Sequence, residues 1–245
     1  MPKFFVRQNQ IQDGIIRLCG DDAFHISRSL RMAKGERISV SDMQGTEYEC
    51  ELEDFLQDAV LARILVSRRS DNEPPKKIYL YQALPKGDKL DTVIQKAVEC
   101  GVYEIHLFES ERCVAKIKGD SETRKNERRN RIALEAAKQC GRGYIPVVHE
   151  TTDFRKAVEQ ACDADLWLFC YEGESETSLK AALAERGKDV KSISVLVGSE
   201  GGFSLSEASY AIERGAVAVT LGKRILRTET AASFVLGCLV YEYEM

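Results

Sequence analysis

From residue 78 onward, apolar runs of strand length alternate with amphipathic runs of helix length, and this alternation strongly constrains the fold. The expected strands are 78–83, 104–108, 165–170, 192–197 and 216–221, and the expected helices are 88–100, 120–140, 204–214 and 228–243. The strands are almost continuously apolar, which is typical of a parallel sheet that helices cover on both faces. The sequence therefore predicts an α/β fold for this part of the chain.

The residues before 78 follow a different pattern. Apolar and polar side chains alternate in short runs, and one helix-like insert interrupts them. These runs are 3–6, 14–18, 37–41, 46–52 and 59–66, with the insert at 21–32. Alternation over four to eight residues predicts half-buried strands, and the glycines between the runs suit turns. We therefore expect a small β-barrel.

A polar segment that contains Pro74 and Pro75 separates the two patterns. It extends over 67–77, and its composition is typical of a linker. The expected division is a β-barrel at 1–70, a linker at 71–77 and an α/β domain at 78–245.

Composition indicates a globular protein and excludes several other classes. Of the 245 residues, 44% are hydrophobic and 30% are charged. No apolar run reaches the roughly 18 residues that a membrane span requires, and the first residues lack the apolar core of a signal peptide. The eight cysteines are scattered, with no CxxC spacing and no zinc-like cluster with the three histidines. We expect a cytoplasmic protein with no membrane partner, no disulfides and no metal ion.

The formal net charge of −4 conceals an asymmetry along the chain. Residues 112–142 contain ten basic and four acidic side chains, and residues 1–37 contain seven basic and four acidic ones. In contrast, residues 150–213 contain thirteen acidic and six basic side chains. A basic run is most often a solvated helix face, but two such runs also suit a surface that follows a phosphate backbone.

A dense group of glycines follows the strand expected at 192–197. The loop extends from Gly198 to Gly202, and Ser204 with Glu207 matches a helix capping box. Glycines let a backbone approach a ligand closely, and α/β proteins bind ligands at the carboxyl ends of parallel strands. The loop fits neither common nucleotide fingerprint, and Glu200 would repel a phosphate. A tight connection without any ligand explains the loop equally well.

A second strand, loop and helix repeat this arrangement near the C-terminus. Gly222 follows the strand, and Thr228 can cap the last helix. Arg224 and Arg227 lie between them, and a solvated surface position would also explain both arginines. Two successive units with conspicuous loops nevertheless favour a ligand site over coincidence.

Two motifs in these loops are specific when taken together. They are Gly198-x-Glu200-Gly201-Gly202-Phe203 and Leu221-Gly222-x-Arg224-Ile225-Leu226-Arg227-x-Glu229-Thr230-Ala231. Both resemble motifs of the RsmE family of RNA methyltransferases, in the SPOUT superfamily. Further similar motifs stand in family order at 25–31, 84–89, 95–102, 110–112 and 135–146. The chain departs from the family at Ser199, where a proline is common, and the loss of that proline frees the local backbone slightly.

The resemblance implies a fold and an activity. Such proteins pair an N-terminal PUA-like β-barrel with a C-terminal SPOUT domain, whose chain forms a deep trefoil knot, and they act as homodimers. They transfer the methyl group of S-adenosylmethionine to N3 of a uridine in small-subunit (16S) ribosomal RNA. The alternatives are a SPOUT ribose 2′-O-methyltransferase and a non-catalytic RNA-binding protein on the same scaffold.

The resemblance also implies site residues. Those expected to bind the cofactor are Tyr171, Glu172, Leu196, Val197, Gly198, Glu200, Gly201, Leu221, Gly222, Ile225, Leu226, Thr228 and Ala231. Arg227 and Arg224 are candidates for stabilising a uridine anion. Glu200 and Glu229 are candidates for accepting its proton, although fixing the loop geometry explains them slightly better. The expected RNA contacts are Arg7, Arg28, Arg31, Lys86, Lys96, Arg112 and Arg142.

The last helix supports a homodimer independently of the resemblance, because its apolar residues are too many for a free surface helix. These residues are Phe234, Val235, Leu236, Leu239 and Val240. A face turned toward the protein's own core is the alternative explanation.

Overall fold

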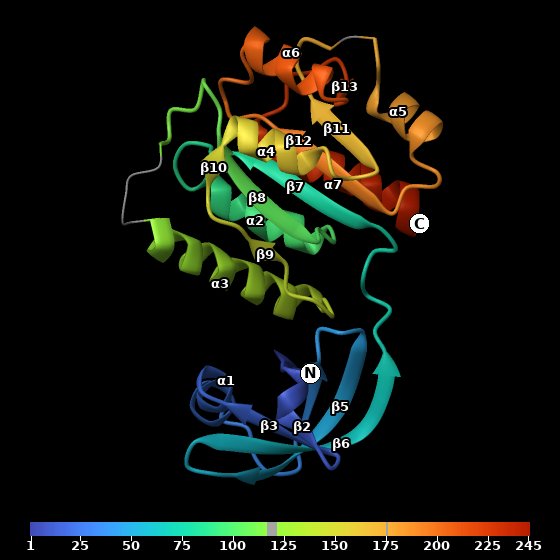
Figure 1. Ribbon diagram of the computed structural model, residues 1–245. Helices are drawn as coiled ribbons and strands as arrows, with labels where there is room; N and C mark the ends of the chain where they lie inside the picture. Colours follow the sequence, from blue (N-terminus) through green and yellow to red (C-terminus); the bar gives the residue numbers. More distant parts are fainter. Residues whose placement is uncertain (117–121, 175) are drawn as a thin grey trace. The chain divides into compact units, whose positions relative to one another are not determined.

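The computed structural model describes residues 1–116, 122–174 and 176–245, and the chain divides into two compact units (Figure 1). Unit 1 comprises residues 1–73 and 137–145, and unit 2 comprises residues 74–136 and 146–245. The expected boundary near residue 70 lies close to this division. Residues 137–145, which the sequence pattern assigned to the second domain, instead pack with the first.

Unit 1 is built on a six-stranded sheet with the order β1-β4-β5-β6-β3-β2. Its strands are β1 (Lys3–Phe5), β2 (Ile11–Gln12), β3 (Ile15–Cys19), β4 (Arg37–Ser41), β5 (Thr46–Phe55) and β6 (Ala59–Arg69). β1 pairs with β4 in parallel, and the other neighbouring strands are antiparallel. The expected helical insert consists of α1 (Asp21–Phe24) and a π-helical turn, η2 (His25–Ser29), and a short 3-10 turn, η1 (Gln8–Gln10), follows β1.

Alternation along these strands explains the core of unit 1. In β4, Ile38 and Val40 are buried while Arg37 is exposed, because successive side chains of a strand point to opposite faces. Phe4, Ile16 and other apolar residues of the same face complete one buried cluster.

Residues 137–145 are held in unit 1 by polar contacts that are distant in sequence. The Glu73 carboxylate accepts hydrogen bonds from the Arg142 guanidinium at 2.6 Å and from the backbone N–H of Gly143 at 2.8 Å. The Ser41 hydroxyl donates to the Gly143 carbonyl at 2.6 Å. These bonds join residues 69 to 102 positions apart, so no local pattern could predict them.

Unit 2 contains a seven-stranded parallel sheet with the order β10-β8-β7-β12-β11-β13, in which β9 also pairs with β8. Its strands are β7 (Lys77–Ala83), β8 (Glu104–Glu109), β9 (Val147–Val148), β10 (Thr152–Asp153), β11 (Leu166–Cys170), β12 (Ser192–Val197) and β13 (Val217–Val219). The expected parallel sheet is therefore confirmed, and all five expected strands are present.

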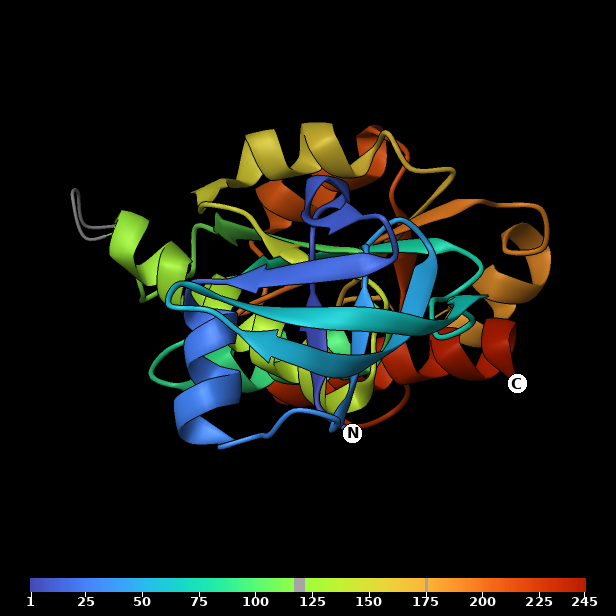
Figure 2. The same ribbon diagram turned by 90° about the horizontal axis from the view of Figure 1, so that it is seen from below.

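Helices cover both faces of this sheet. They are α2 (Lys89–Glu99), α4 (Phe154–Ala161), α5 (Leu179–Arg186), α6 (Leu205–Glu213) and α7 (Thr228–Glu244), and α3 (Glu122–Cys140) continues from unit 2 into residues of unit 1. Figures 1 and 2 show α4 on one face of the sheet and α2 with α7 on the other. Asp153, Ser178 and Ser204 cap the helices that follow them, and Ser204 forms the expected capping box with Glu207. The start expected for the helix at 120–140, residue 120, lies outside the described residues.

The last helix differs from the expectation in where its apolar face points. Val235, Leu236 and Leu239 have no exposed surface, because α7 packs against α2 and β12 within unit 2. The prediction that these three residues form a dimer face is therefore wrong, and the core explanation holds for them. Phe234 and Tyr241 remain 45% and 72% exposed. Among the described residues, no helix is long and apolar enough to cross a membrane.

Candidate functional site

A large cavity of unit 2 lies where three parallel strands end. β11 ends at Cys170, and the pairing register sets this residue opposite Val197 of β12 and Val219 of β13. The three carboxyl ends are therefore level, and the loops that follow them enclose a cavity of about 970 Å³. This is the position at which parallel α/β sheets bind ligands.

The glycine loop after β12 forms one wall of the cavity, and its glycines are required by close contacts. A Cβ atom on Gly198 would lie 2.9 Å from the Phe203 ring, and one on Gly201 would lie 2.8 Å from Cβ of Arg112. Gly202 has a φ of +62°, which an L side chain rarely adopts. The loop is therefore a tight turn whose backbone faces the cavity directly.

Ser199 occupies the position at which the resemblance implies a proline, and the loop stays closed there. The residue is 6% exposed, and the Gly202 N–H donates to its carbonyl oxygen at 3.0 Å. Its hydroxyl is buried and has no hydrogen-bond partner among the described residues. A buried hydroxyl of this kind favours a polar ligand atom nearby.

A hydrogen-bonded chain connects the glycine loop to the start of α7. The Thr228 hydroxyl donates to the Gly198 carbonyl at 2.6 Å and accepts from Nε2 of Gln82 at 2.9 Å. Gln82 is fully buried at the end of β7, and Thr228 is 4% exposed. Three segments far apart in sequence are thus held together at the cavity floor.

Glu200 is held by Lys89 and by the backbone. Nζ of Lys89 lies 2.6 Å from its carboxylate, and the Lys86 N–H donates to it at 3.2 Å. Burial would raise the pKa of this carboxyl, but the hydrogen bonds from Lys89 and from backbone N–H groups outweigh burial and lower the pKa below its usual range. Glu229 lies 3.9 Å from the same Nζ atom. Glu200 is thus held ionised as a loop anchor.

The loop after β13 forms the opposite wall and carries the two candidate arginines. Arg224 and Arg227 both line the cavity and are exposed, and Ile225 between them is 86% exposed. Tyr171 and Glu172, from the loop after β11, line the cavity as well. Cations, a carboxylate and apolar groups therefore meet around one space.

Most residues that the sequence assigned to a cofactor or to catalysis line this cavity. They are Tyr171, Glu172, Val197, Gly198, Glu200, Leu221, Gly222, Arg224, Ile225, Leu226, Arg227, Thr228 and Ala231. Leu196 is instead fully buried inside β12, and neither Gly201 nor Glu229 lines the cavity. Sequence reasoning missed Lys89, Gly173, Thr220 and Lys223, which do line it. For Gly173, Thr220 and Lys223 the available signal was position, since each closely follows an end of a strand, whereas Lys89 begins α2 and had no such signal.

The expected RNA contacts have different environments. Arg7, Arg28 and Arg31 are exposed on unit 1, and Lys86, Lys96 and Arg112 are exposed on unit 2. Arg112 also lines the cavity. The prediction for Arg142 is wrong, because its side chain is 4% exposed and is occupied by the ion pair with Glu73. Within the basic segment, Arg129 is likewise buried and pairs with Glu122.

Family models identify both units. Residues 72–240 match the RNA methyltransferase domain, and residues 18–57 match the RNA methyltransferase PUA domain. The α/β unit with its cavity and the smaller β unit together define the class of RNA methyltransferases that carry a PUA domain.

Similarity to individual proteins shows to which family within this class the chain belongs. Ribosomal RNA small subunit methyltransferase E of Bacillus subtilis is 32% identical, covering 100% of this chain and 98% of that protein. The crystal structure of a Ribosomal RNA small subunit methyltransferase E from Neisseria gonorrhoeae bound to S-adenosyl methionine has a TM-score of 0.83 at 29% identity, covering 99% and 98% of the two chains. A methyltransferase of Legionella pneumophila in complex with SAM has a TM-score of 0.84 at 29% identity, covering 98% and 97%. The chain belongs to the ribosomal RNA small subunit methyltransferase E family.

Proposed function

We propose that the protein transfers the methyl group of S-adenosylmethionine to N3 of a specific uridine in small-subunit ribosomal RNA, in the cytoplasm. The observation that carries the proposal is the cavity at the level ends of β11, β12 and β13, with Arg224 and Arg227 on its wall. Full-length similarity to a small-subunit methyltransferase supports the substrate class.

The cavity residues fit S-adenosylmethionine. The backbone of 198–202 and 221–226 offers N–H and C=O groups, and the buried Ser199 hydroxyl lacks a partner among the described residues. Glu172 contributes a carboxylate beside Gly202, which suits a cationic ligand. The cofactor supplies an electrophilic methyl group on a positively charged sulfur.

The residues of this chain would act on the uridine by binding and by charge. N3 of uridine carries a proton and lies on the pairing edge, so the base must leave any stacked helix first. We propose that Arg227, assisted by Arg224, stabilises the negative charge that develops on the base. Because both carboxylates face Lys89, we propose that Glu200 and Glu229 position the loops, and that the N3 proton leaves to solvent water.

We further propose that the chain of unit 2 forms a deep trefoil knot. After β13, which pairs with β11, the chain returns to Thr228, whose hydroxyl bonds both Gln82 of β7 and Gly198 after β12. The last helix therefore starts beside the ends of two strands that precede β13 in sequence, and this return of the chain supports the proposal. For unit 1, we propose that the six-stranded sheet closes as a PUA-like β-barrel.

We propose a homodimer formed through unit 2. Phe234 and Tyr241 are exposed, and residues seven apart lie on one face of a helix, two turns from each other. An exposed apolar pair of this kind suits an interface. Sedimentation equilibrium of the full chain tests this, and a monomer that is fully active would contradict it.

The modified nucleoside decides among the candidate functions. Small subunits from a strain that lacks this activity would be incubated with the protein and S-adenosylmethionine, digested to nucleosides and analysed by mass spectrometry. We expect 3-methyluridine at one position. A 2′-O-methylated nucleoside would favour the ribose methyltransferase, and a lack of cofactor binding by calorimetry would favour the non-catalytic RNA-binding protein.

The role of Arg227 can be separated from cofactor binding. Because a group that stabilises only the transition state acts on the chemical step, Arg227→Ala should lower kcat by about 100-fold or more and leave the Kd of S-adenosylmethionine nearly unchanged. Arg186→Ala is the matched control, since Arg186 is exposed at the end of α5 and lies outside the cavity lining. Equal turnover by both variants would refute the assignment.

A further inference from the structure

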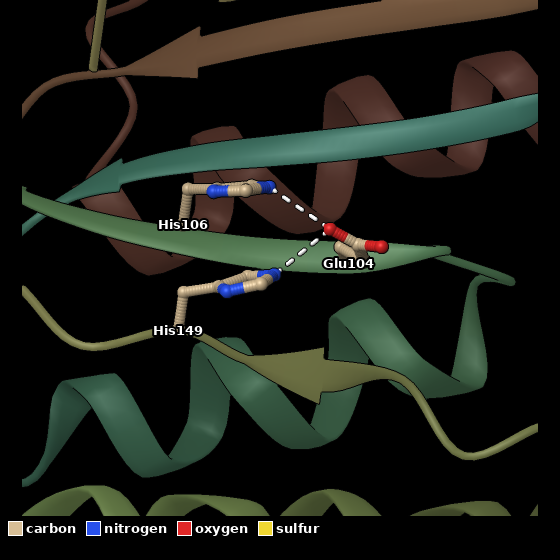
Figure 3. Close-up of side chains that lie close together, drawn as sticks. All are labelled: Glu104, His106 and His149. Atoms are coloured by element: carbon tan, nitrogen blue, oxygen red, sulfur yellow. Dashed lines mark hydrogen bonds and ion pairs between the residues drawn. The ribbon is translucent and has the colours of Figure 1, made fainter. Parts of the chain in front are cut away.

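Three potential metal ligands meet on the sheet of unit 2. Glu104 and His106 belong to β8, and His149 directly follows β9 (Figure 3). Nε2 of His149 lies 2.8 Å from Oε2 of Glu104, and Nε2 of His106 lies 3.3 Å from the same oxygen. All three ligand atoms lie within 4.8 Å of one another.

The strand pairing brings these side chains together. Glu104 and His106 are two residues apart on β8, so their side chains share one face. Ile105 pairs with Val148, and the backbone N–H of His149 donates to the Ile105 carbonyl at 2.8 Å. This pairing sets His149 beside His106. The two imidazole rings stack with centroids 4.2 Å apart.

A third ring supports this arrangement from the neighbouring strand. Tyr81 of β7 pairs with His106 in register, and its ring stacks on that imidazole with centroids 4.5 Å apart. The His106 side chain is 14% exposed and that of His149 is 41% exposed. His106 is therefore held between the rings of Tyr81 and His149. The more exposed His149 gives an ion from solvent access to the cluster.

Two imidazole nitrogens and one carboxylate oxygen are ligands that zinc binds in proteins, at about 2.0–2.2 Å. Around a tetrahedral ion at that distance, ligand atoms lie roughly 3.3 Å from one another. The distances from the Glu104 oxygen to the two nitrogens, 2.8 and 3.3 Å, are close to this value. Small side-chain rotations would therefore admit an ion between groups that now contact one another directly.

We propose that Glu104, His106 and His149 form a binding site for a borderline divalent metal ion such as Zn²⁺, with water completing the coordination. None of the three residues lines the cavity of the candidate active site. The ion would join β8 to the segment after β9, so its role would be structural. Each imidazole would bind the ion through Nε2 in its neutral form, with its one ring proton on Nδ1.

Histidine NMR tests the site directly, because the chain has only three histidines. Zn²⁺ would be titrated into the chelator-treated full-length protein while the imidazole Cε1–H signals are recorded. We expect the signals of His106 and His149 to shift with saturation at one equivalent, and that of His25 to stay in place. Mg²⁺ should shift none of the three, because it prefers oxygen ligands.

Variants and thermal unfolding complete the test. His149→Ala should weaken Zn²⁺ binding by at least about 100-fold and Glu104→Gln by at least about 10-fold, with His25→Ala as the matched control. Zn²⁺ should raise the Tm of the parent protein and of His25→Ala but not of His149→Ala. The fluorescence of Trp167, the single tryptophan, verifies that each variant folds.

The proposal fails if Zn²⁺ leaves the signals of His106 and His149 unchanged, since the three residues would then form a hydrogen-bonded cluster only. It also fails if His149→Ala binds Zn²⁺ as tightly as the parent protein, because the eight free cysteines would then account for binding.

Discussion

The contact between Thr228 and the glycine loop should be essential to the stability of unit 2. Thr228→Val keeps the shape of the side chain but removes the hydroxyl that donates to the Gly198 carbonyl and accepts from Gln82. Gln82 is fully buried and Thr228 is 4% exposed, so on the Gln82 side of the contact water has little access to replace the lost partner. The substitution therefore isolates the hydrogen bonds from the packing.

The magnitude follows from the groups left without partners. Gln82 keeps its bonds from Nε2 to the Ala83 carbonyl at 2.8 Å and to the Gly198 carbonyl at 3.4 Å, whereas the Gly198 carbonyl loses its shorter hydrogen bond, of 2.6 Å. Loss of a hydrogen bond whose buried partner is left poorly satisfied costs about 1–3 kcal/mol, so the free energy of unfolding should fall by about 2 kcal/mol. Because the Gly198 carbonyl belongs to the loop that lines the cavity, the Kd of S-adenosylmethionine should rise by about tenfold, which corresponds to about 1.4 kcal/mol.

Urea unfolding provides the assay. The fluorescence of Trp167, which is 4% exposed in β11, reports the unfolding of unit 2 specifically. Ser233→Ala is the matched control, because, within the described part of the chain, the Ser233 hydroxyl donates only to the Glu229 carbonyl of its own helix, at 2.9 Å. Its loss should change stability by less than about 0.5 kcal/mol.

A Thr228→Val protein that is as stable as Ser233→Ala would refute the reasoning. It would mean that the Gly198 carbonyl finds another donor at no cost. Unchanged stability together with weaker cofactor binding would instead limit the role of Thr228 to the geometry of the loop.

Two further substitutions test the glycine loop. Gly201→Ala should raise the Kd of S-adenosylmethionine by at least about tenfold, as measured by calorimetry, because its Cβ would lie 2.9 Å from the Arg112 carbonyl oxygen and displace the loop; an unchanged Kd would contradict this. Because the pKa of Glu200 is lowered, its stabilising effect is complete above the unfolded-state value and is lost as the pH falls through the lower folded-state value. The Tm difference between the parent protein and Glu200→Gln should thus be constant near neutral pH, begin to decrease near the unfolded-state value of about 4.3 and disappear below the lowered folded-state pKa; a difference that does not decrease in acid would exclude the ion pair with Lys89.

Much of unit 2 could be predicted from its sequence because the relevant signals are local. The strand expected at 192–197 has these bounds in the structure, and the capping box of Ser204 with Glu207 forms as expected. Helix α4 was not expected, although Asp153 caps it and an apolar face follows. It has eight residues, and a run of that length is difficult to distinguish from a strand.

The remaining features depend on contacts between segments that are distant in sequence. Arg142 reads as an exposed cation, but it is buried against Glu73, 69 positions away. Gln82 carries no motif, yet it supports the cavity because β7 lies beside β12. His149 joins Glu104 and His106 only because β9 pairs with β8.

The sequence by itself therefore determined the parallel α/β architecture, the family and the loops that enclose the cavity, because periodicity, glycine turns and helix caps act over a few neighbouring residues. Only the tertiary structure decided which charges face solvent, which helix face is core and which side chains meet. Those outcomes depend on strand order and register, which bring together residues that no local pattern relates.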